Sequence, residues 1–418
     1  MTRAGALKQL GWDTRSLTVT AGSGLSVPIV SPVVPTTESA LRVYWTAFIG
    51  LFFDYYDLYL FVYLEKVLAG EFALTAAQSN WLQFAGLAGV GVGALGFGYL
   101  ADRFGRGRMM LAVFAVYAAG IAGLSLAWNY ESLLVFRLLA SLSLGAEWGI
   151  CHTYLAERVD GARRYRFAAL LQFSILGGLL AALMARYALP VVGWRWLFAA
   201  SIVPVAVLSA ARWRTLAGEE RTVGAPSLPV SGASTLPMAI IENWRPFLLC
   251  FGLASLTIAS GTVNIFFAKE LPQSPVFTIL FWANVAPGML AGAWVVQRWG
   301  VARALLLYAV GLMALSTASW FSGSTRSGLV FALALPLLNG IPFGLMGAWF
   351  NEVFGSYRTL LSGTAYNLGR ILAGFAPMLI TGLGLNENGR YFIFTAILGL
   401  GVLGLAGVMR RGGVGQGH

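Results

Sequence analysis

The sequence predicts an all-α integral membrane protein in which twelve transmembrane helices form two related halves of six. The first indication is composition: of 418 residues, 58% are hydrophobic and only 11% are charged, whereas a soluble domain carries roughly 25% charged residues. The second is a succession of apolar runs, each long enough to cross about 30 Å of hydrocarbon as a helix. The third is a repetition of polar positions in the second half at a constant offset of 195 residues.

The chain divides at one long polar segment. Residues 213–243 carry Pro, Ser and Gly and are predicted to form a cytoplasmic linker between a first half, 41–212, and a second half, 244–409. Residues 1–40 are predicted to be a disordered cytoplasmic tail, and 410–418 a second cytoplasmic tail. The predicted spans are 41–64, 79–101, 109–128, 131–156, 167–189, 194–212, 244–268, 275–297, 303–322, 327–351, 360–383 and 390–409.

The distribution of Lys and Arg predicts the orientation. Twenty of these residues lie on the side of the predicted spans that holds both termini, and five lie on the other side. Because cytoplasmic loops are enriched in Lys and Arg, both termini are predicted to be cytoplasmic. This bias also explains the net charge of +11 without nucleic-acid binding. No cleavable signal peptide is visible, and we expect a monomeric protein of the bacterial inner membrane.

A charged loop lies between the second and third predicted spans. It carries the pattern Gly98-x-Leu-Ala-Asp102-Arg103-x-Gly105-Arg106, in which glycines permit a tight turn and charges suit the flanking helix ends. This pattern resembles the signature loop of the major facilitator superfamily; the alternative is a generic positively charged inner loop. The resemblance implies that superfamily's fold and a cytoplasmic loop that latches the two halves of a transporter.

The internal repeat extends this pattern. Shifting by 195 residues places Asp102-Arg103-Phe-Gly105 on Gln297-Arg298-Trp-Gly300, so the second loop lacks the acid and is predicted to be a weaker latch. The same shift relates glycines and charges near the end of the fourth and tenth spans. A duplicated six-helix unit predicts a binding site at mid-membrane between the halves. The residues assigned to the latch are Gly98, Asp102, Arg103, Gly105, Arg106, Glu157, Arg163, Glu352 and Arg358.

Two acids lie in the first predicted span. Asp54 is close to the middle of 41–64, and Asp57 follows one helical turn later on the same face. A charge at the bilayer centre costs at least about 2.5–3.5 kcal/mol, so each needs a reason. Burial and a like-charged neighbour both favour the protonated form of a carboxyl group. The pair is therefore predicted to couple transport to protons, the alternative being a purely structural pair.

The fourth predicted span carries Arg137 and Glu147. They lie about 15 Å apart along a helix axis, so they are not expected to pair with each other. Arg137 matches the superfamily's span-four arginine, which implies a proton-coupling, substrate-binding or structural role. Glu147 is predicted to be a second protonation site, or else a cap for neighbouring helix ends. His152 is expected to be a packed histidine at a helix interface.

The eleventh predicted span carries Tyr366, Asn367 and Arg370, with Arg370 near its midpoint. Arginine is always charged and binds carboxylates bidentately, so Arg370 is predicted to hold an anionic substrate. The alternative is an ion pair with Asp54 or Asp57. Asn264 and Gln172 are further candidates for the binding cavity, although polar residues in membrane helices are more often helix–helix contacts.

Several stretches of the first half narrow the resemblance. They are Asp54-Tyr-Tyr-Asp57, Gly145-Ala-Glu147-Trp148-Gly149 and Val192-Gly-Trp-Arg195. They resemble organic-acid:proton symporters, first the sialate/monocarboxylate group and next the aromatic-acid and shikimate types. The resemblance covers 41 to about 215, with an alanine in place of the usual glycine before Glu147. It implies proton-coupled uptake of a small organic anion, such as a monocarboxylate or sugar acid, by alternating access.

Two other functions stay open: a proton-coupled exporter of a drug or metabolite, and a transporter-like sensor that moves nothing. The Gly-Pro signature of exporters is absent from the fifth span, and a sensor has no reason to keep costly charges in the membrane. An enzyme is not expected, because no nucleophile–base pair and no metal-ligand spacing is present. Cys151 and Cys250 are isolated, so no cofactor or metal is expected. The predicted partners are the organic anion, the proton and the lipid bilayer.

Overall fold

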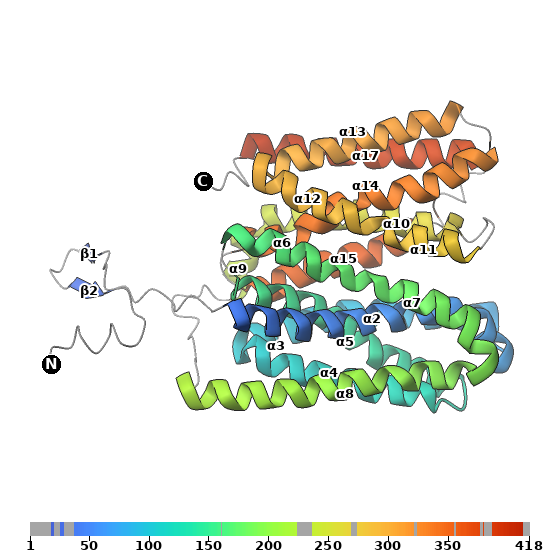
Figure 1. Ribbon diagram of the computed structural model, residues 1–418, viewed down its shortest axis with the longest axis horizontal. Coiled ribbons are helices and arrows are strands. Elements are labelled where there is room, and N and C mark those ends of the chain that lie inside the picture. Colours follow the sequence, from blue (N-terminus) through green and yellow to red (C-terminus); the bar gives the residue numbers. More distant parts are fainter. Residues whose placement is uncertain are drawn as a thin grey trace.

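The protein is a bundle of long helices that lie side by side along one direction (Figure 1). The computed structural model describes residues 18–20, 26–28, 37–159, 161–223, 236–268, 274–321, 324–354, 357–376, 379 and 387–412. The first and last helices of the bundle are α2 (Thr37–Glu71) and α17 (Glu387–Gly412). The N-terminus of α2 and the C-terminus of α17 lie on the same side of the bundle (Figure 1). We call this side the terminal end and the opposite side the distal end.

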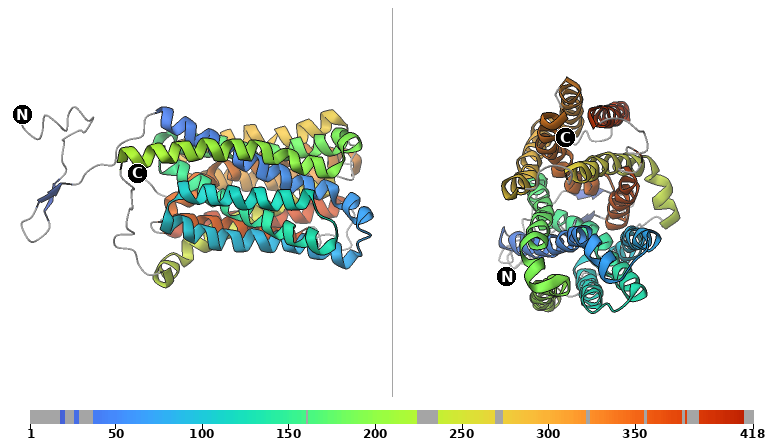
Figure 2. Two further views of the ribbon diagram at one scale, coloured as in Figure 1. Left: turned by 90° about the horizontal axis from the view of Figure 1, so that it is seen from below. Right: turned by 90° about the vertical axis from the view of Figure 1, so that its right-hand side faces the viewer.

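Each half of the chain supplies its own group of helices, and the end-on view in Figure 2 shows the two groups on opposite sides of the bundle. The first half continues from α2 with α3 (Ala76–Phe104), α4 (Arg106–Ser125), α5 (Tyr130–Ala156), α6 (Gly161–Gln172), the 3₁₀ turn η1 (Phe173–Leu176), α7 (Gly177–Leu183), the π turn η2 (Met184–Ala188) and α8 (Leu189–Val223). The second half consists of α9 (Leu236–Glu242), α10 (Trp244–Ala268), α11 (Pro275–Ala283), α12 (Val285–Trp299), α13 (Val301–Phe321), α14 (Ser324–Val353), α15 (Arg358–Gly374) and α17.

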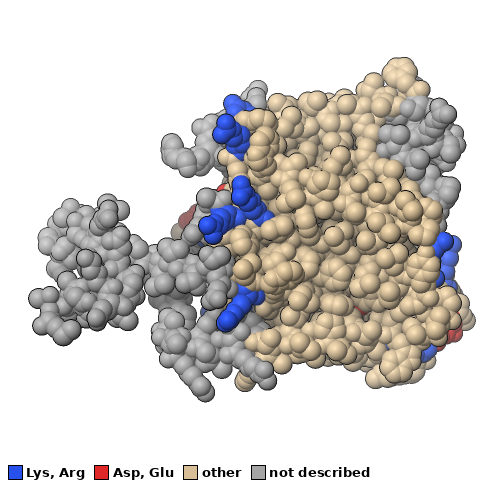
Figure 3. Space-filling view, in the orientation of Figure 1, with Lys and Arg blue, Asp and Glu red and all other residues tan. Residues whose placement is uncertain are grey.

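The described helices confirm a multi-pass membrane protein. Ten segments are long and apolar enough to span a membrane, and Figure 3 shows a broad uncharged belt between Lys and Arg at the two ends. One segment, Arg163–Ala211, covers the fifth and sixth predicted spans, and Gly193, at φ 78°, breaks the helix where they meet. Helix α15 overlaps the predicted span 360–383, part of which lies outside the described residues. Each predicted span overlaps a described helix, while the total of twelve stays a prediction.

The polar segments outside the predicted spans contain some described secondary structure. Within the predicted tail, β1 (Thr18–Thr20) and β2 (Ser26–Pro28) form an antiparallel pair. The predicted linker 213–243 is helical at both ends, because α8 continues to Val223 and α9 lies before α10. Arg, Leu, Ala and Glu are good helix formers, which explains why the helix continues past the end of the apolar span. Residues 224–235 and 413–418 lie outside the described residues.

The two halves repeat in their packing as well as in sequence. Gly105 and Gly300, 195 residues apart, both have positive φ, 94° and 82°, and both join consecutive helices. Gly145 leaves no room for a Cβ because α5 lies against the backbone of Val90. At the same offset, Gly340 of α14 lies against the backbone of Val285. The structure thus supports a duplicated helical unit and brings residues of α2, α5 and α15 to the middle of the bundle.

Candidate functional site

A pair of buried carboxyl groups joins α2 to α5. Asp54 and Glu147 are 3% and 1% exposed and interact with each other, while Asp54 Oδ2 and Glu147 Oε1 have no hydrogen-bond partner among the described residues. Helix α2 approaches closely here, since a Cβ on Gly50 would clash with Glu147 Oε1. Two carboxyl groups can share a hydrogen bond only when one of them holds a proton, because an ionised carboxylate has no donor. Two carboxyl groups in this arrangement can therefore hold one proton between them.

The sequence pairs Asp54 with Asp57, but the structure separates their contacts. Asp57 accepts hydrogen bonds from Tyr117 Oη on α4 and from Ser201 Oγ on α8, the latter at 3.2 Å. Both partners belong to the first half, so Asp57 ties α2 to its own half. Sequence reasoning missed Tyr117 and Ser201, since a tyrosine and a serine so far along the chain from Asp57 give no local signal.

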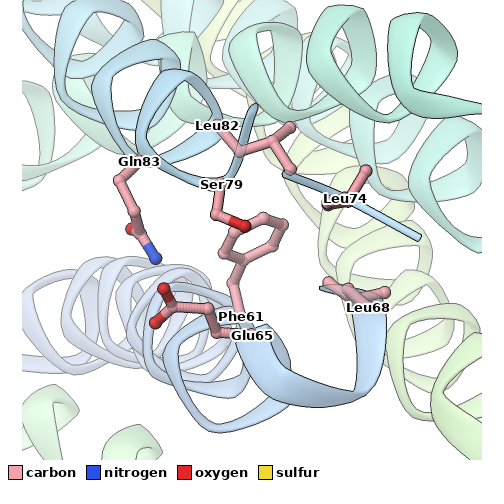
Figure 4. Close-up of a pocket in the computed structure, with 7 residues that line it drawn as sticks. All are labelled: Phe61, Glu65, Leu68, Leu74, Ser79, Leu82 and Gln83. Carbon is pink, nitrogen blue, oxygen red and sulfur yellow. The ribbon is translucent and has the colours of Figure 1, made fainter. Parts of the chain in front are cut away.

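Arg137 lies against an aromatic ring inside the first half. It is 5% exposed, its guanidinium lies 3.9 Å from the centroid of Phe61, and it interacts electrostatically with Asp57. Phe61 also lines a small cavity near the distal end, where the side chains of Glu65 and Gln83 point toward each other (Figure 4). These contacts favour the proton-coupling or structural role over direct binding of substrate.

Arg370 on α15 is 8% exposed and lies among tyrosine rings. Its guanidinium is 5.7 Å from the ring centroid of Tyr55 and 5.1 Å from that of Tyr366. Nη2 donates to Tyr55 Oη at 3.5 Å, and Nη1 has no hydrogen-bond partner among the described residues. Among the residues that the structure describes, Arg370 forms no ion pair with Asp54 or Asp57. Asp54 acts on this buried cation electrostatically without an ion-pair contact, and a buried cation without a carboxylate in direct contact is unfavourable unless a ligand supplies one.

Aromatic side chains from both halves surround this cation. Tyr366 stacks on Trp148 with ring centroids 3.9 Å apart and an interplanar angle of 2°. Its hydroxyl lies 3.2 Å from that of Tyr55, whose ring stacks against Tyr59 at 6.4 Å. Tyr366 was predicted, whereas Tyr55 and Tyr59 had no feature in the sequence to separate them from packing residues.

The amides of Gln172 and Asn367 make contacts between helices. Gln172 Oε1 accepts from Trp148 Nε1 and lies beside His152 Nε2, both at 3.2 Å, while its Nε2 donates to the carbonyl of Phe343. Asn367 Nδ2 donates to the carbonyl of Gly145 at 2.8 Å, which holds α15 against α5. The expected packed state of His152 agrees with its 1% exposure. Gln172 therefore positions Trp148, Asn367 joins two helices, and Asn264 lies in a separate cavity described below.

The charged loop after α3 reaches across the bundle to the start of α15. Asp102 accepts hydrogen bonds from the backbone N–H groups of Thr359 and Leu360, at 3.3 and 2.9 Å. Arg106 pairs with Asp102 at 2.8 Å and with Glu157 at 3.2 Å. An acidic side chain at a helix N-terminus is stabilised by unpaired N–H groups and by the helix dipole. These contacts join the halves at the terminal end.

Glycines allow the close approach at this end. A Cβ on Gly98 would lie 3.0 Å from the Cα of Leu360. Gly105 makes the turn into α4 with positive φ. Of the predicted latch arginines, Arg103 lies over the ring of its neighbour Phe104, at 5.5 Å. Asp102 and Arg106 reach the second half with their side chains, Asp102 through the backbone N–H groups above and Arg106 through Nε, which donates to Thr359 Oγ1 at 3.3 Å.

The matching contact of the second half involves Arg164, the neighbour of the predicted latch residue Arg163. Glu352 accepts from Tyr165 Oη at 2.5 Å and pairs with Arg164 at 3.4 Å, while Arg163 is exposed. Arg358 donates to the carbonyl of Phe354 and interacts electrostatically with Glu157. The rotation of α6 about its own axis decides which of these two adjacent arginines faces the second half.

Comparison with known proteins agrees with this architecture. The sequence model of the Major Facilitator Superfamily matches residues 47–377. The chain belongs to this superfamily. The niacin transporter NiaP of Acinetobacter baylyi is 25% identical over 409 residues, covering 86% of this chain and 91% of that protein. The cis,cis-muconate transport protein of the same organism is 26% identical over 351 residues, covering 80% and 85%.

A solved structure shows the same fold. The proton:xylose symporter XylE bound to 6-bromo-6-deoxy-D-glucose superposes with a TM-score of 0.64 at 17% identity, over 90% of this chain and 96% of that one. The resemblance that the loop Gly98–Arg106 indicated is thereby confirmed. The chain is a major facilitator transporter, not an enzyme, and it is similar to transporters of organic acids.

Proposed function

We propose that this protein takes up a small organic anion together with a proton by alternating access. The observation that carries the proposal is Arg370, a buried guanidinium with a free Nη1 and no carboxylate partner among the described residues. A guanidinium is always charged and has the geometry to bind a carboxylate through two parallel hydrogen bonds. An organic anion would supply the missing countercharge, and the names of the similar transporters support this class of substrate.

In this proposal the proton binds to the Asp54–Glu147 pair. Two adjacent carboxylates resist simultaneous ionisation, so the pair holds one proton and titrates as a unit. Asp54 interacts electrostatically with Arg370, which allows the charge at one site to influence the other. Binding of proton and anion together leaves the centre of the bundle less charged, and this favours movement of the halves around it. Asp57, held by Tyr117 and Ser201, positions α2.

The Asp102 loop is proposed to act as the latch. In the described conformation it closes the terminal end through the N-terminus of α15. The excess of Lys and Arg in the segments of this end supports a cytoplasmic location for it, in a bacterial inner membrane. The closed latch would accompany the outward-facing state and would open to release substrate inside.

Uptake into proteoliposomes tests the proposal. Labelled organic acids are presented with an inward proton gradient to wild-type protein and to Asp54→Asn, Glu147→Gln and Arg370→Gln, with exposed Arg303→Gln as the matched control. Wild type and the control should accumulate an acid against its gradient. The two carboxyl variants should keep exchange and lose accumulation, and Arg370→Gln should lose both. The symport mechanism is wrong if no acid moves or if these variants match wild type, and gradient-driven efflux would instead indicate an exporter.

A further inference from the structure

A cavity of about 70 Å³ lies between the halves, beside the tyrosines that surround Arg370. Since a water-sized occupant needs ~10–15 Å³ on this measure, it has room for a group of several heavy atoms. Its lining comes from α2, η1, α10, α11, α12 and α14. The lining residues are Tyr59, Ile175, Ile258, Gly261, Thr262, Asn264, Phe281, Trp282, Val285, Pro336, Asn339 and Phe343.

The walls of this cavity suit an apolar group. None of the described residues that line it is charged, and aromatic rings form much of the surface. Trp282 makes edge-to-face contacts with Tyr59 at 4.7 Å and with Phe281 at 5.8 Å. Tyr59 connects the cavity to the anion site, because it stacks on Tyr55 and interacts electrostatically with Arg370. The cavity and the aromatic group around Arg370 therefore share Tyr59 as a common wall.

One polar atom in the cavity has no partner. Asn264 is 2% exposed, and its Oδ1 makes no hydrogen bond with the described residues. Its Nδ2 faces the carbonyl of Ala332 at 3.5 Å, and this contact identifies the free end of the amide as the oxygen, since two acceptors would repel each other. A buried acceptor without a donor is unfavourable. The cavity thus offers an acceptor to any O–H or N–H group that enters it.

Asn339, the other amide of the cavity, does not compete for that role. Its Oδ1 already accepts from Ser260 Oγ at 2.8 Å and from Tyr308 Oη at 2.7 Å. Thr262 likewise donates to the carbonyl of Ile258 within its own helix. The free acceptor therefore lies on α10, in the cavity that Tyr59 also lines.

We propose that the substrate is a carboxylate with an apolar body that carries a hydroxyl or N–H donor remote from the carboxylate. Arg370 binds the carboxylate, the cavity holds the body, and Asn264 Oδ1 accepts from the remote donor. This inference rests on the proposed anion site and adds the chemical class of the substrate. Asn264 becomes a residue that determines specificity, because it discriminates between acids that differ only in that donor.

The test compares matched ring acids in proteoliposome uptake. Benzoate, 3- and 4-hydroxybenzoate, and 3- and 4-fluorobenzoate share a carboxylate and an apolar ring, and fluorine is close in size to hydroxyl but cannot donate. Wild type should prefer one hydroxybenzoate over its fluoro counterpart in kcat/KM. In Asn264→Ala that preference should fall by roughly two- to tenfold, the range for one neutral hydrogen bond, while fluorobenzoate uptake persists.

Asn284→Ala is the matched control, because Asn284 donates to the carbonyl of Leu333, next to the carbonyl that Asn264 contacts, and does not line the cavity. It should keep the wild-type preference. Gly261→Val gives an independent readout, since a Cβ at Gly261 meets nothing within 4 Å and a larger side chain there fills the cavity. This variant should lose uptake of ring acids more than uptake of acetate or lactate.

The outcomes separate this inference from the proposed function. Uptake of carboxylates with equal kcat/KM for hydroxy and fluoro acids in wild type would overturn the inference and leave the anion site standing. Equal loss of both acids in Asn264→Ala would do the same, because it would show a structural role. If Asn264→Ala does not fold, the inference is still tested by the preference of the wild type for hydroxybenzoate over fluorobenzoate and by the uptake of ring acids in Gly261→Val. Absence of any carboxylate uptake would overturn the proposed function and this inference together.

Discussion

Replacing Asp102 by Asn should open the terminal end of the bundle. Of the contacts of Asp102, the pair with Arg106 stays within the first half when the halves separate, whereas the bonds to the N–H groups of Thr359 and Leu360 break. Asparagine still accepts a hydrogen bond but carries no charge. A charge at a partly buried helix N-terminus is worth up to about 2 kcal/mol, so the loss should be about 1–2 kcal/mol. That corresponds to a roughly 5- to 30-fold shift toward open states.

Distances between spin labels at the terminal end would measure this shift. Arg163 on α6 and Arg303 on α13 are exposed and belong to different halves, and the native Cys151 and Cys250 are buried. Asp102→Asn should increase the long-distance population, and Arg103→Gln, which removes a charge that lies over Phe104, should not. An unchanged distribution in Asp102→Asn, or an equal change in the control, would refute the helix-capping argument.

Three further predictions concern packing, pH and Asp57. Gly145→Val should lower the thermal unfolding temperature, because overpacking against the backbone of Val90 reduces the unfolding free energy by about 1–3 kcal/mol or more. The control Gly96→Val, at an exposed position, should leave the unfolding temperature unchanged. Burial raises the pKa of Glu157 in the closed state, so closing of the terminal end takes up protons. The distances between the same spin labels should therefore shift toward the closed state as the pH falls through that raised pKa. Glu157→Gln should flatten this pH dependence. Tyr117→Phe removes a donor to Asp57 and should reduce unfolding stability by about 1–3 kcal/mol; loss of proton-driven accumulation with unchanged stability would contradict the positioning role.

The buried residues of the site show how much of it can be predicted from the local sequence pattern. Asp54, Glu147 and Arg370 were identifiable because a charge inside an apolar run is costly and therefore has a reason to be there. Their partners were not identifiable, since contacts between residues far apart in the chain depend on helix rotation and packing. The structure accordingly placed Asp54 beside Glu147, gave Asp57 hydrogen-bond partners on α4 and α8, and left Arg370 without the ion pair that the sequence offered as an alternative.

By itself the sequence determined a helical membrane protein with two related halves and a charged loop of the major facilitator type. It could do so because hydropathy, glycine turns and a repeated offset are properties of neighbouring residues or of a simple shift. Only the tertiary structure decided that Asp102 contacts the N-terminus of α15, that Arg164 rather than Arg163 meets Glu352, and that Asn264 offers a free acceptor. Those facts depend on which face each helix turns toward its neighbours, and that choice is made by the packing of the whole bundle.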